Sequence, residues 1–319
     1  MKCIEIKDQK LVLTERPLPK LKSGEVLVKV YAAGVNRPDL LQRKGLYPPP
    51  KGVTDIPGLE IAGEIVKGAG KGKKVCALVA GGGYAEYCAV PAGQCLPLPK
   101  NMDFVTAAGI PETFFTVWRN LFGYGQMKKG KAVLIHGGAS GIGTTAIQLA
   151  RAFGAKVYVT AGSDKKCRAC KKLGAHVAIN YKTQDFVTEI LKATKGRGVD
   201  IVLDMVGGDY LPRNLKVLAE GGRHVSIAMQ RGRTAEVGIF DIMSKNLTLT
   251  GSTLRARSVA DKTATAHELR KHVWPLLNTE KVKPVIDKTF PLARAQEAHD
   301  YLEAGEHVGK VILTVTNCA

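Results

Sequence analysis

The chain has 319 residues, and its 47 lysines and arginines against 28 aspartates and glutamates give a formal net charge of +19. Hydrophobic residues make up 45% of the sequence, a proportion that excludes a disordered or collagen-like chain. At about 150 residues per domain, the length predicts two domains. No apolar run reaches the roughly 18 residues of a membrane span, and the first residues lack the apolar region of a signal peptide. We therefore expect a cytoplasmic protein.

The high positive charge has two competing explanations. The chain could bind nucleic acid or a membrane surface, or the charge could attract a polyanionic small molecule. The basic residues are scattered, and the aromatic residues, 6% of the chain, do not alternate with them as stacking platforms for single strands would. We interpret most of the charge as solvated surface. The seven cysteines are expected to be reduced thiols.

The pattern of predicted elements changes near residue 120. Before it, short β-rich runs such as Glu25–Tyr31, Ile61–Val66 and Val75–Val79 are separated by glycine and proline, which predicts an irregular antiparallel β domain. From Lys131 onward, apolar strands alternate with helical stretches, the pattern of a doubly wound parallel sheet. The predicted strands are 132–136, 156–160, 176–180, 199–206, 223–228 and 247–252, with helices such as 144–153, 165–173 and 185–193 between them.

The segment after residue 258 follows neither pattern alone. It combines a helical stretch, Lys262–Asn278, a proline-bounded run, Val285–Leu292, a second helix, Ala293–Ala304, and a final strand, 310–315. We expect this tail to return to the N-terminal domain. The predicted domains are residues 1–119, residues 120–258 and a return segment of residues 259–319.

A glycine-rich turn gives the strongest functional signal. A predicted strand runs into the turn, and Gly141-Ile142-Gly143-Thr144-Thr145-Ala146, which fits G-x-G-x-x-A, opens directly into an amphipathic helix. The glycines let backbone N–H groups approach a pyrophosphate, which then lies at the positive end of the helix. A glycine motif inside a complete βαβ unit predicts a dinucleotide site.

The end of the next strand indicates which dinucleotide binds. Enzymes that prefer NAD place an acid about 20 residues after the glycines, to hold the ribose 2′-hydroxyl. Here that position falls on Ala161-Gly162-Ser163, followed by Asp164 and then by Lys165, Lys166 and Arg168. A small neutral pair next to cations suits a 2′-phosphate, so the sequence predicts NADPH.

The same turn resembles that of short-chain dehydrogenases, which carry a Tyr-x-x-x-Lys pair well after it. Tyr47/Lys51 and Tyr124/Lys128 have this spacing, but both precede the turn. The short-chain alternative is therefore excluded.

With about 120 residues of β-rich chain before the turn, the sequence resembles the quinone oxidoreductase (zeta-crystallin) branch of the medium-chain dehydrogenase/reductase superfamily. Within it, the likeness is greatest to the tumour-suppressor-inducible quinone oxidoreductase subgroup. The resemblance implies a β-rich, GroES-like N-terminal domain joined to a Rossmann domain. The matching segments are AAGVNRPDLLQRKGLYPPP (32–50), PGLEIAGEIV (57–66), GGGYAEYCAVP (81–91), AAGIPETFFTVW (107–118), GGASGIGTTAIQLA (137–150), GVDIVLDMVGG (198–208) and GEHVGKVIL (305–313).

Zinc ligands distinguish the alcohol dehydrogenases of this superfamily from its quinone reductases. Gly58-Leu59-Glu60 stands where the zinc enzymes have Gly-His-Glu, and the four closely spaced cysteines of a structural zinc lobe are missing from the sequence. Cys167 and Cys170 form a single C-x-x-C, which we interpret as packed thiols on a helix. We therefore expect a metal-free protein.

Without a Lewis acid, the chemistry suits an acceptor that needs little polarisation, and a quinone is such an acceptor because its reduction yields an aromatic hydroquinone anion. The resemblance places Asn36, Tyr47 and Asp39 at the substrate. Asn36 or Tyr47 could donate a hydrogen bond to the quinone oxygen. Alternatively, Asn36 could cap a helix at Pro38–Arg43, and Asp39 could be structural rather than catalytic.

The resemblance also implies a set of cofactor contacts. Ser140, Gly141 and Ile142 would cover the pyrophosphate. The 2′-phosphate pocket would comprise Gly162, Ser163, Lys166 and Tyr181, and the nicotinamide half would lie against Tyr47, Thr116, Phe240, Leu254 and His307.

These observations predict an NADPH-dependent quinone reductase that works by direct hydride transfer. Relatives pair the last strand of the Rossmann sheet across a two-fold axis, and 247–252 alternates as such an edge strand would, so we expect a homodimer or a dimer of dimers. Two alternatives stay open. One is an NADPH-dependent reductase of α,β-unsaturated carbonyls, and the other is a nucleic-acid-binding protein with a secondary reductase activity.

Overall fold

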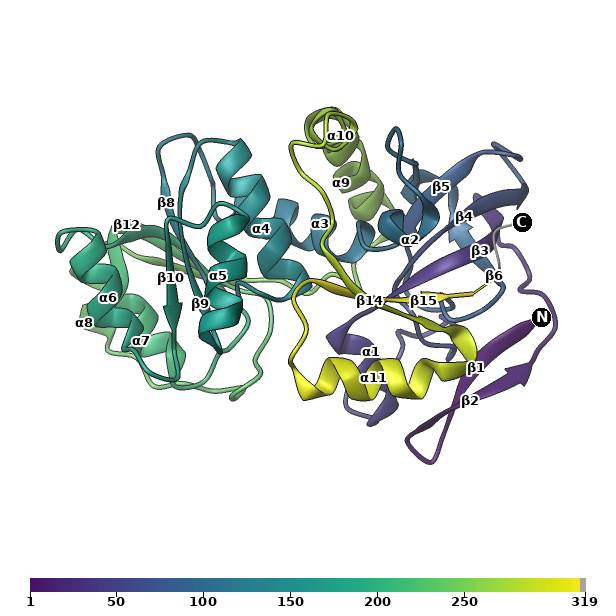
Figure 1. Ribbon diagram of the computed structural model, residues 1–319, viewed down its shortest axis with the longest axis horizontal. Coiled ribbons are helices and arrows are strands. Elements are labelled where there is room, and N and C mark those ends of the chain that lie inside the picture. The colour runs from purple at the N-terminus through teal and green to yellow at the C-terminus, as the bar shows by residue number, and fades with distance from the viewer. Residues whose placement is uncertain (316–319) are drawn as a thin grey trace. The chain divides into compact units, whose positions relative to one another are not determined.

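The computed structural model describes residues 1–315, which form two compact units (Figure 1). The first unit contains Met1–Phe115 together with the chain from Leu254 onward, and the second contains Thr116–Thr253. No helix within residues 1–315 combines the length and apolar character that a membrane crossing requires.

The second unit is built on a six-stranded parallel sheet with the strand order β10-β9-β8-β11-β12-β13. The order starts in the middle and grows outward in both directions, which is the doubly wound arrangement. This confirms the predicted fold class. The strands are β8 (Ala132–Ile135), β9 (Lys156–Ala161), β10 (Val177–Asn180), β11 (Val199–Asp204), β12 (Leu218–Ser226) and β13 (Thr248–Gly251).

Helices connect these strands, as the alternation of apolar and amphipathic segments predicts. The buried residues of β8 and β11 form near-continuous apolar runs because helices cover both faces of the sheet. The helices of this unit are α4 (Gly141–Ala152), α5 (Asp164–Lys172), α6 (Phe186–Ala193), α7 (Tyr210–Val217) and α8 (Ile239–Met243), and a π-helix, η2 (Trp118–Tyr124), follows α3 (Pro111–Val117).

The first unit contains a larger, mainly antiparallel sheet with the order β14-β15-β3-β4-β5-β7, and β6 also pairs with β3. A separate hairpin is formed by β1 (Lys2–Lys7) and β2 (Lys10–Glu15). The other strands are β3 (Glu25–Val35), β4 (Glu60–Lys67), β5 (Lys74–Leu78), β6 (Tyr87–Pro91), β7 (Cys95–Pro97), β14 (Ile286–Pro291) and β15 (Lys310–Thr314).

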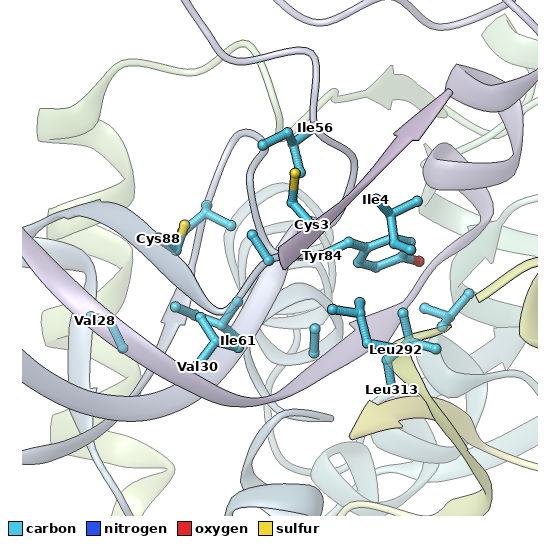
Figure 2. Close-up of a cluster of buried hydrophobic side chains, with 14 of the residues drawn as sticks. Cys3, Ile4, Val28, Val30, Ile56, Ile61, Tyr84, Cys88, Leu292 and Leu313 are labelled. Carbon is cyan, nitrogen blue, oxygen red and sulfur yellow. The ribbon is translucent and has the colours of Figure 1, made fainter. Parts of the chain in front are cut away.

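The C-terminal tail completes this sheet, which confirms the predicted return. Strand β15 runs antiparallel to β3, with Val311 opposite Val35 and Leu313 opposite Ala33, and β14 adds beside it. Figure 2 shows the resulting core, in which Ile4, Ile61, Leu292 and Leu313 gather near the buried ring of Tyr84. Strands from both ends of the chain therefore share one apolar core.

The helical stretch predicted over 262–278 belongs to the first unit and is confirmed. The structure divides it into two helices, α9 (Val259–His272) and α10 (Trp274–Asn278). Pro275 lies in the first turn of α10, where its missing N–H costs nothing, but it could not continue the preceding helix. The remaining helices are α1 (Arg37–Arg43), α2 (Phe104–Ala107), α11 (Ala295–Ala304), η1 (Ala92–Gln94) and η3 (Leu292–Arg294).

Candidate functional site

The glycine-rich turn between β8 and α4 has the geometry of an anion site. Ser140 caps α4, because its Oγ accepts a hydrogen bond of 3.0 Å from the Gly143 N–H and donates one of 2.7 Å to the Gly137 carbonyl. The remaining N–H groups at the start of this twelve-residue helix carry partial positive charge. Ser140, Gly141 and Ile142 are all partly accessible.

The turn is too tight for side chains at two of its glycines. A Cβ on Gly143 would lie 2.3 Å from the Gly137 carbonyl oxygen. Gly137 has φ +69°, and a Cβ there would also meet the Met205 sulfur at 2.5 Å. The sequence G-x-G therefore serves close backbone packing, which keeps the helix N-terminus open to a ligand.

The predicted 2′-phosphate residues gather at the end of β9. Ser163 caps α5 by accepting a hydrogen bond from the Lys166 N–H, and the Tyr181 hydroxyl would lie 2.8 Å from a Cβ on Gly162. Asp164 is turned away to the next strand, since its Oδ1 accepts a 2.8 Å hydrogen bond from the Asn180 side chain. The structure thus brings Gly162, Ser163 and Tyr181 together and engages the nearest acid elsewhere.

The other predicted cofactor contacts divide between the two units. Thr116 and Phe240 belong to the second unit, and Phe240 in α8 is 77% exposed. Leu254 and His307 belong to the first unit, where Leu254 is buried and His307 is partly accessible.

A buried polar cluster occupies the first unit where β3, β4 and β15 meet. The Glu60 carboxylate accepts hydrogen bonds of 2.8 Å from Asn36 Nδ2 and from the Glu112 N–H, and it forms an ion pair with Lys310 Nζ at 2.6 Å. Glu60 is fully buried, and Gly34 makes room for it, because a Cβ there would lie 2.0 Å from Glu60 Oε1. A charge this deep must be paired, and Lys310 provides the partner.

Asn36 is held firmly by this cluster. Its Oδ1 accepts a 2.6 Å hydrogen bond from Lys310, and one amide hydrogen is directed to Glu60. The other amide hydrogen has only a 3.5 Å contact with the Gly34 carbonyl. Asn36 directly precedes α1, which begins one residue earlier than expected, at Arg37. Its side chain can therefore still donate one hydrogen bond to a ligand.

Asp39 lies in the first turn of α1 and is completely buried. Its carboxylate accepts hydrogen bonds from the backbone N–H groups of Asn36 and Gly58 and from the Tyr84 hydroxyl. Burial raises the pKa of Asp39 to about 6, although these hydrogen bonds oppose the shift. The Tyr84 hydroxyl also contacts His299 Nε2 at 3.1 Å. Such enclosure favours the structural alternative for Asp39.

Tyr47 is held by a segment from far along the chain. The Arg255 guanidinium lies 5.5 Å from the centre of the Tyr47 ring, and it bonds the Tyr47 carbonyl, the Ala80 carbonyl and the Gln42 side chain. Lys262 in turn donates a 2.7 Å hydrogen bond to the Arg255 carbonyl. Tyr47 remains partly accessible, so its ring can form one wall of a site.

Glu112 is a candidate functional residue that the sequence analysis does not single out. It lies in the first turn of α3, and its backbone N–H is hydrogen-bonded to Glu60. Burial and the neighbouring Glu60 charge raise the pKa of Glu112 to about 8. The sequence signal is an acid after proline inside an otherwise apolar run, 107–118. Together with Asn36 and Tyr47, Glu112 gives the first unit polar groups suited to binding a carbonyl oxygen.

The residues at the zinc positions of alcohol dehydrogenases bear on metal binding. Leu59, at the position of the zinc-ligating histidine, is a buried apolar side chain. Cys167 and Cys170 of α5 are buried thiols. Within residues 1–315, no group of three or more His, Cys, Asp or Glu side chains is arranged to hold a metal ion.

Comparisons with known proteins match both units. The alcohol dehydrogenase GroES-like domain matches residues 22–100, and the zinc-binding dehydrogenase family matches residues 141–271. The chain is 33% identical to the quinone oxidoreductase of Rattus norvegicus over 308 residues, which cover 93% of this chain and 91% of the rat protein.

Two solved structures have the same fold over nearly the whole chain. The Escherichia coli quinone oxidoreductase complexed with NADPH has a TM-score of 0.88 and 29% identity, and the match covers 99% of this chain and 100% of that one. The CurK enoyl reductase has a TM-score of 0.87 and 27% identity, with 99% of each chain covered.

Proposed function

Because the chain belongs to the zinc-free quinone oxidoreductase branch of the medium-chain dehydrogenase/reductase superfamily, we propose that it is an NADPH-dependent quinone reductase. The arrangement of side chains at the end of β9 supports this choice of cofactor. There Ser163 caps α5 by accepting a hydrogen bond from the Lys166 N–H, and the Tyr181 hydroxyl lies close to Gly162. The nearest acid in the sequence, Asp164, is hydrogen-bonded to Asn180. This arrangement accommodates a 2′-phosphate and offers no acid to a 2′-hydroxyl.

NADPH fits the residues of the second unit. The open N-terminus of α4, with Ser140, Gly141 and Ile142, would bind the pyrophosphate. Gly162, Ser163, Lys166 and Tyr181 would hold the 2′-phosphate. When bound, the cofactor supplies the hydride. We assign its nicotinamide half to Tyr47, Thr116, Phe240, Leu254 and His307.

The first unit would bind the quinone. Asn36 has one amide hydrogen available for a quinone oxygen, and the Tyr47 ring offers a flat, partly accessible surface. Asp39 would position this pair, since its carboxylate holds the Asn36 backbone. In this proposal, residues 1–119 and 259–319 form the catalytic domain, and residues 120–258 form the nucleotide-binding domain.

The choice of cofactor gives the first testable prediction. Replacing Lys166 by alanine removes a charged hydrogen-bond donor from the 2′-phosphate, which is worth about 1.5–3 kcal/mol. The Michaelis constant for NADPH should rise roughly tenfold to a hundredfold, while that for NADH stays nearly unchanged. Equal effects on the two cofactors would contradict the assignment of Lys166.

The substrate class is tested by following NADPH oxidation at 340 nm with ortho- and para-quinones and with an α,β-unsaturated ketone, each repeated with NADH. Rapid turnover of quinones with NADPH alone supports the proposal. Turnover of the unsaturated ketone alone would make the chain an enone reductase. The structural similarity to an enoyl reductase is the reason for testing this class. If neither substrate reacts, steep salt dependence of RNA or DNA binding would favour the nucleic-acid alternative.

We also propose that the protein forms at least a homodimer. Strand β13 is the outermost strand of its sheet, and α8 just before it exposes Ile239, Phe240 and Met243 by 70% or more. An unpaired edge beside apolar side chains is a surface that a second copy can cover. Sedimentation equilibrium of the full chain tests this, and a monomer at micromolar concentration would overturn it.

A further inference from the structure

In the buried polar cluster of the first unit, the Glu112 carboxyl group differs from the carboxyl groups of Glu60 and Asp39 in its hydrogen bonding. Asp39 accepts three hydrogen bonds from the protein, and Glu60 accepts two and forms an ion pair with Lys310. The Glu112 side chain, in contrast, makes no hydrogen bond or ion pair with any residue of 1–315, and it is partly accessible. A desolvated carboxyl group without a protein partner is well suited to a ligand.

We propose that Glu112 is a general acid that protonates the hydroquinone oxygen when a bound quinone is reduced. This inference rests on the function proposed above. It identifies Glu112 as the source of the proton that a metal-free reduction must obtain from the protein or from water. The backbone of Glu112 is held in place, because its N–H donates a 2.8 Å hydrogen bond to the buried Glu60 carboxylate.

The charges around Glu112 favour its protonated form at neutral pH. The carboxylates of Glu60 on β4 and Asp39 on α1 oppose ionisation, whereas Lys310 on β15 and Lys262 on α9 favour it. The side chains of Arg255 and Tyr47, which lie in loops, also interact electrostatically with Glu112. Lys310 already contacts Glu60 and Asn36, and Lys262 already donates a hydrogen bond to the Arg255 carbonyl. Desolvation therefore dominates, and Glu112 keeps its proton until about pH 8.

The proposed step balances as follows. The quinone gains one hydride, which carries both electrons and comes from NADPH, and NADP⁺ is left. The O–H bond of the Glu112 carboxyl breaks, its electron pair stays on the carboxylate, and the proton bonds to the hydroquinone oxygen. Water then returns a proton to Glu112 after the product leaves. A general acid in this role typically contributes about 10²–10⁴ in rate.

The central test is Glu112→Gln in the full-length protein, with saturating NADPH and a para-quinone as substrate. We expect kcat to fall about 100-fold with the Michaelis constant for NADPH unchanged. For the unchanged protein, kcat should decline as pH rises through about 8, because the acid form is lost. Glu112→Gln should lack this decline, and Glu112→Asp should keep it at a lower rate. Glu189→Gln is the matched control, since Glu189 also lies in the first turn of a helix, α6, and is likewise partly accessible.

A series of para-quinones with increasing halogen substitution separates acid catalysis from a structural role. Electron-poor quinones give acidic hydroquinones whose anions need no proton, so the loss caused by Glu112→Gln should shrink along the series. A loss of folding or of positioning would lower all rates by the same factor. Independently of turnover, difference infrared spectroscopy at pH 7 should show a protonated carboxyl band that is missing in Glu112→Gln.

The outcomes distinguish this proposal from the proposed function. If the unchanged protein reduces no quinone, both fall. If it reduces quinones and Glu112→Gln does so equally fast with the same pH profile, only the role of Glu112 is overturned. A constant loss across the quinone series, or an infrared spectrum without the carboxyl band, would also overturn it.

Discussion

Replacing Lys310 by methionine should destabilise the protein by roughly 3–5 kcal/mol at pH 8, the usual cost of removing one partner from a buried ion pair. The Lys310 ammonium forms an ion pair with Glu60 Oε1 at 2.6 Å and donates hydrogen bonds to Asn36 Oδ1 at 2.6 Å and to the Val35 carbonyl at 3.1 Å. Methionine fills similar space but leaves the Glu60 carboxylate uncompensated. Urea unfolding followed by circular dichroism measures the change.

A matched substitution separates the loss of this buried ion pair from the loss of one positive charge. Lys281→Met, at an exposed lysine before β14, is the control and should change the free energy of unfolding by no more than about 0.5 kcal/mol.

A double-mutant cycle with Glu60→Gln identifies the source of the loss. Glutamine at position 60 carries no charge, and its single oxygen can keep only one of the two hydrogen bonds that Asn36 and the Glu112 N–H donate to separate oxygens of Glu60. The double variant should be less destabilised than the sum of the two single variants, by more than 1 kcal/mol. Simple additivity would show that Lys310 acts through packing, and that Glu60 does not depend on its charge.

Much of the fold could be predicted because its signals are local. Most strands of the second unit are largely apolar, and α4, α5, α6 and α7 bury one face, so periodicity finds the doubly wound sheet. The hairpin β1–β2 could not be found in this way. Its turn residues Asp8 and Gln9 have positive φ values of 48° and 61°, which the chain adopts without the usual glycine. The break between α9 and α10 was missed because the apolar pattern continues across Pro275.

The candidate site was less predictable because it depends on register between distant strands. Lys310 reaches Glu60 and Asn36 only because β15 pairs with β3 so that Val311 lies opposite Val35. Nothing near position 310 in the sequence indicates this pairing. The glycine-rich turn, in contrast, carries its cap, its tight backbone and its helix in one continuous segment. A nucleotide-binding motif within one continuous segment can be predicted from the sequence. A polar cluster assembled from four elements cannot.

Glu112→Gln should stabilise the protein in alkaline solution while it abolishes most of the activity. The pKa of Glu112 rises from an ordinary 4.5 to about 8 in the folded state. Between these values the unfolded chain has lost a proton that the folded chain still holds, so stability falls as pH rises from about 4.5 and levels off above about 8. At about 1.4 kcal/mol for each pH unit, the accumulated cost approaches roughly 5 kcal/mol at pH 9.

Glutamine is neutral at every pH, so the variant avoids this cost. The difference in unfolding free energy between Glu112→Gln and the unchanged protein should grow by up to about 4 kcal/mol between pH 5 and pH 9. Parallel urea titrations at these two values measure it, and Glu189→Gln should show no such growth, because that partly accessible side chain on α6 lies outside the buried polar cluster. A difference that stays constant with pH would mean that Glu112 ionises normally. A group that costs stability at high pH yet lies among the polar residues of the candidate site is better explained by catalysis than by folding.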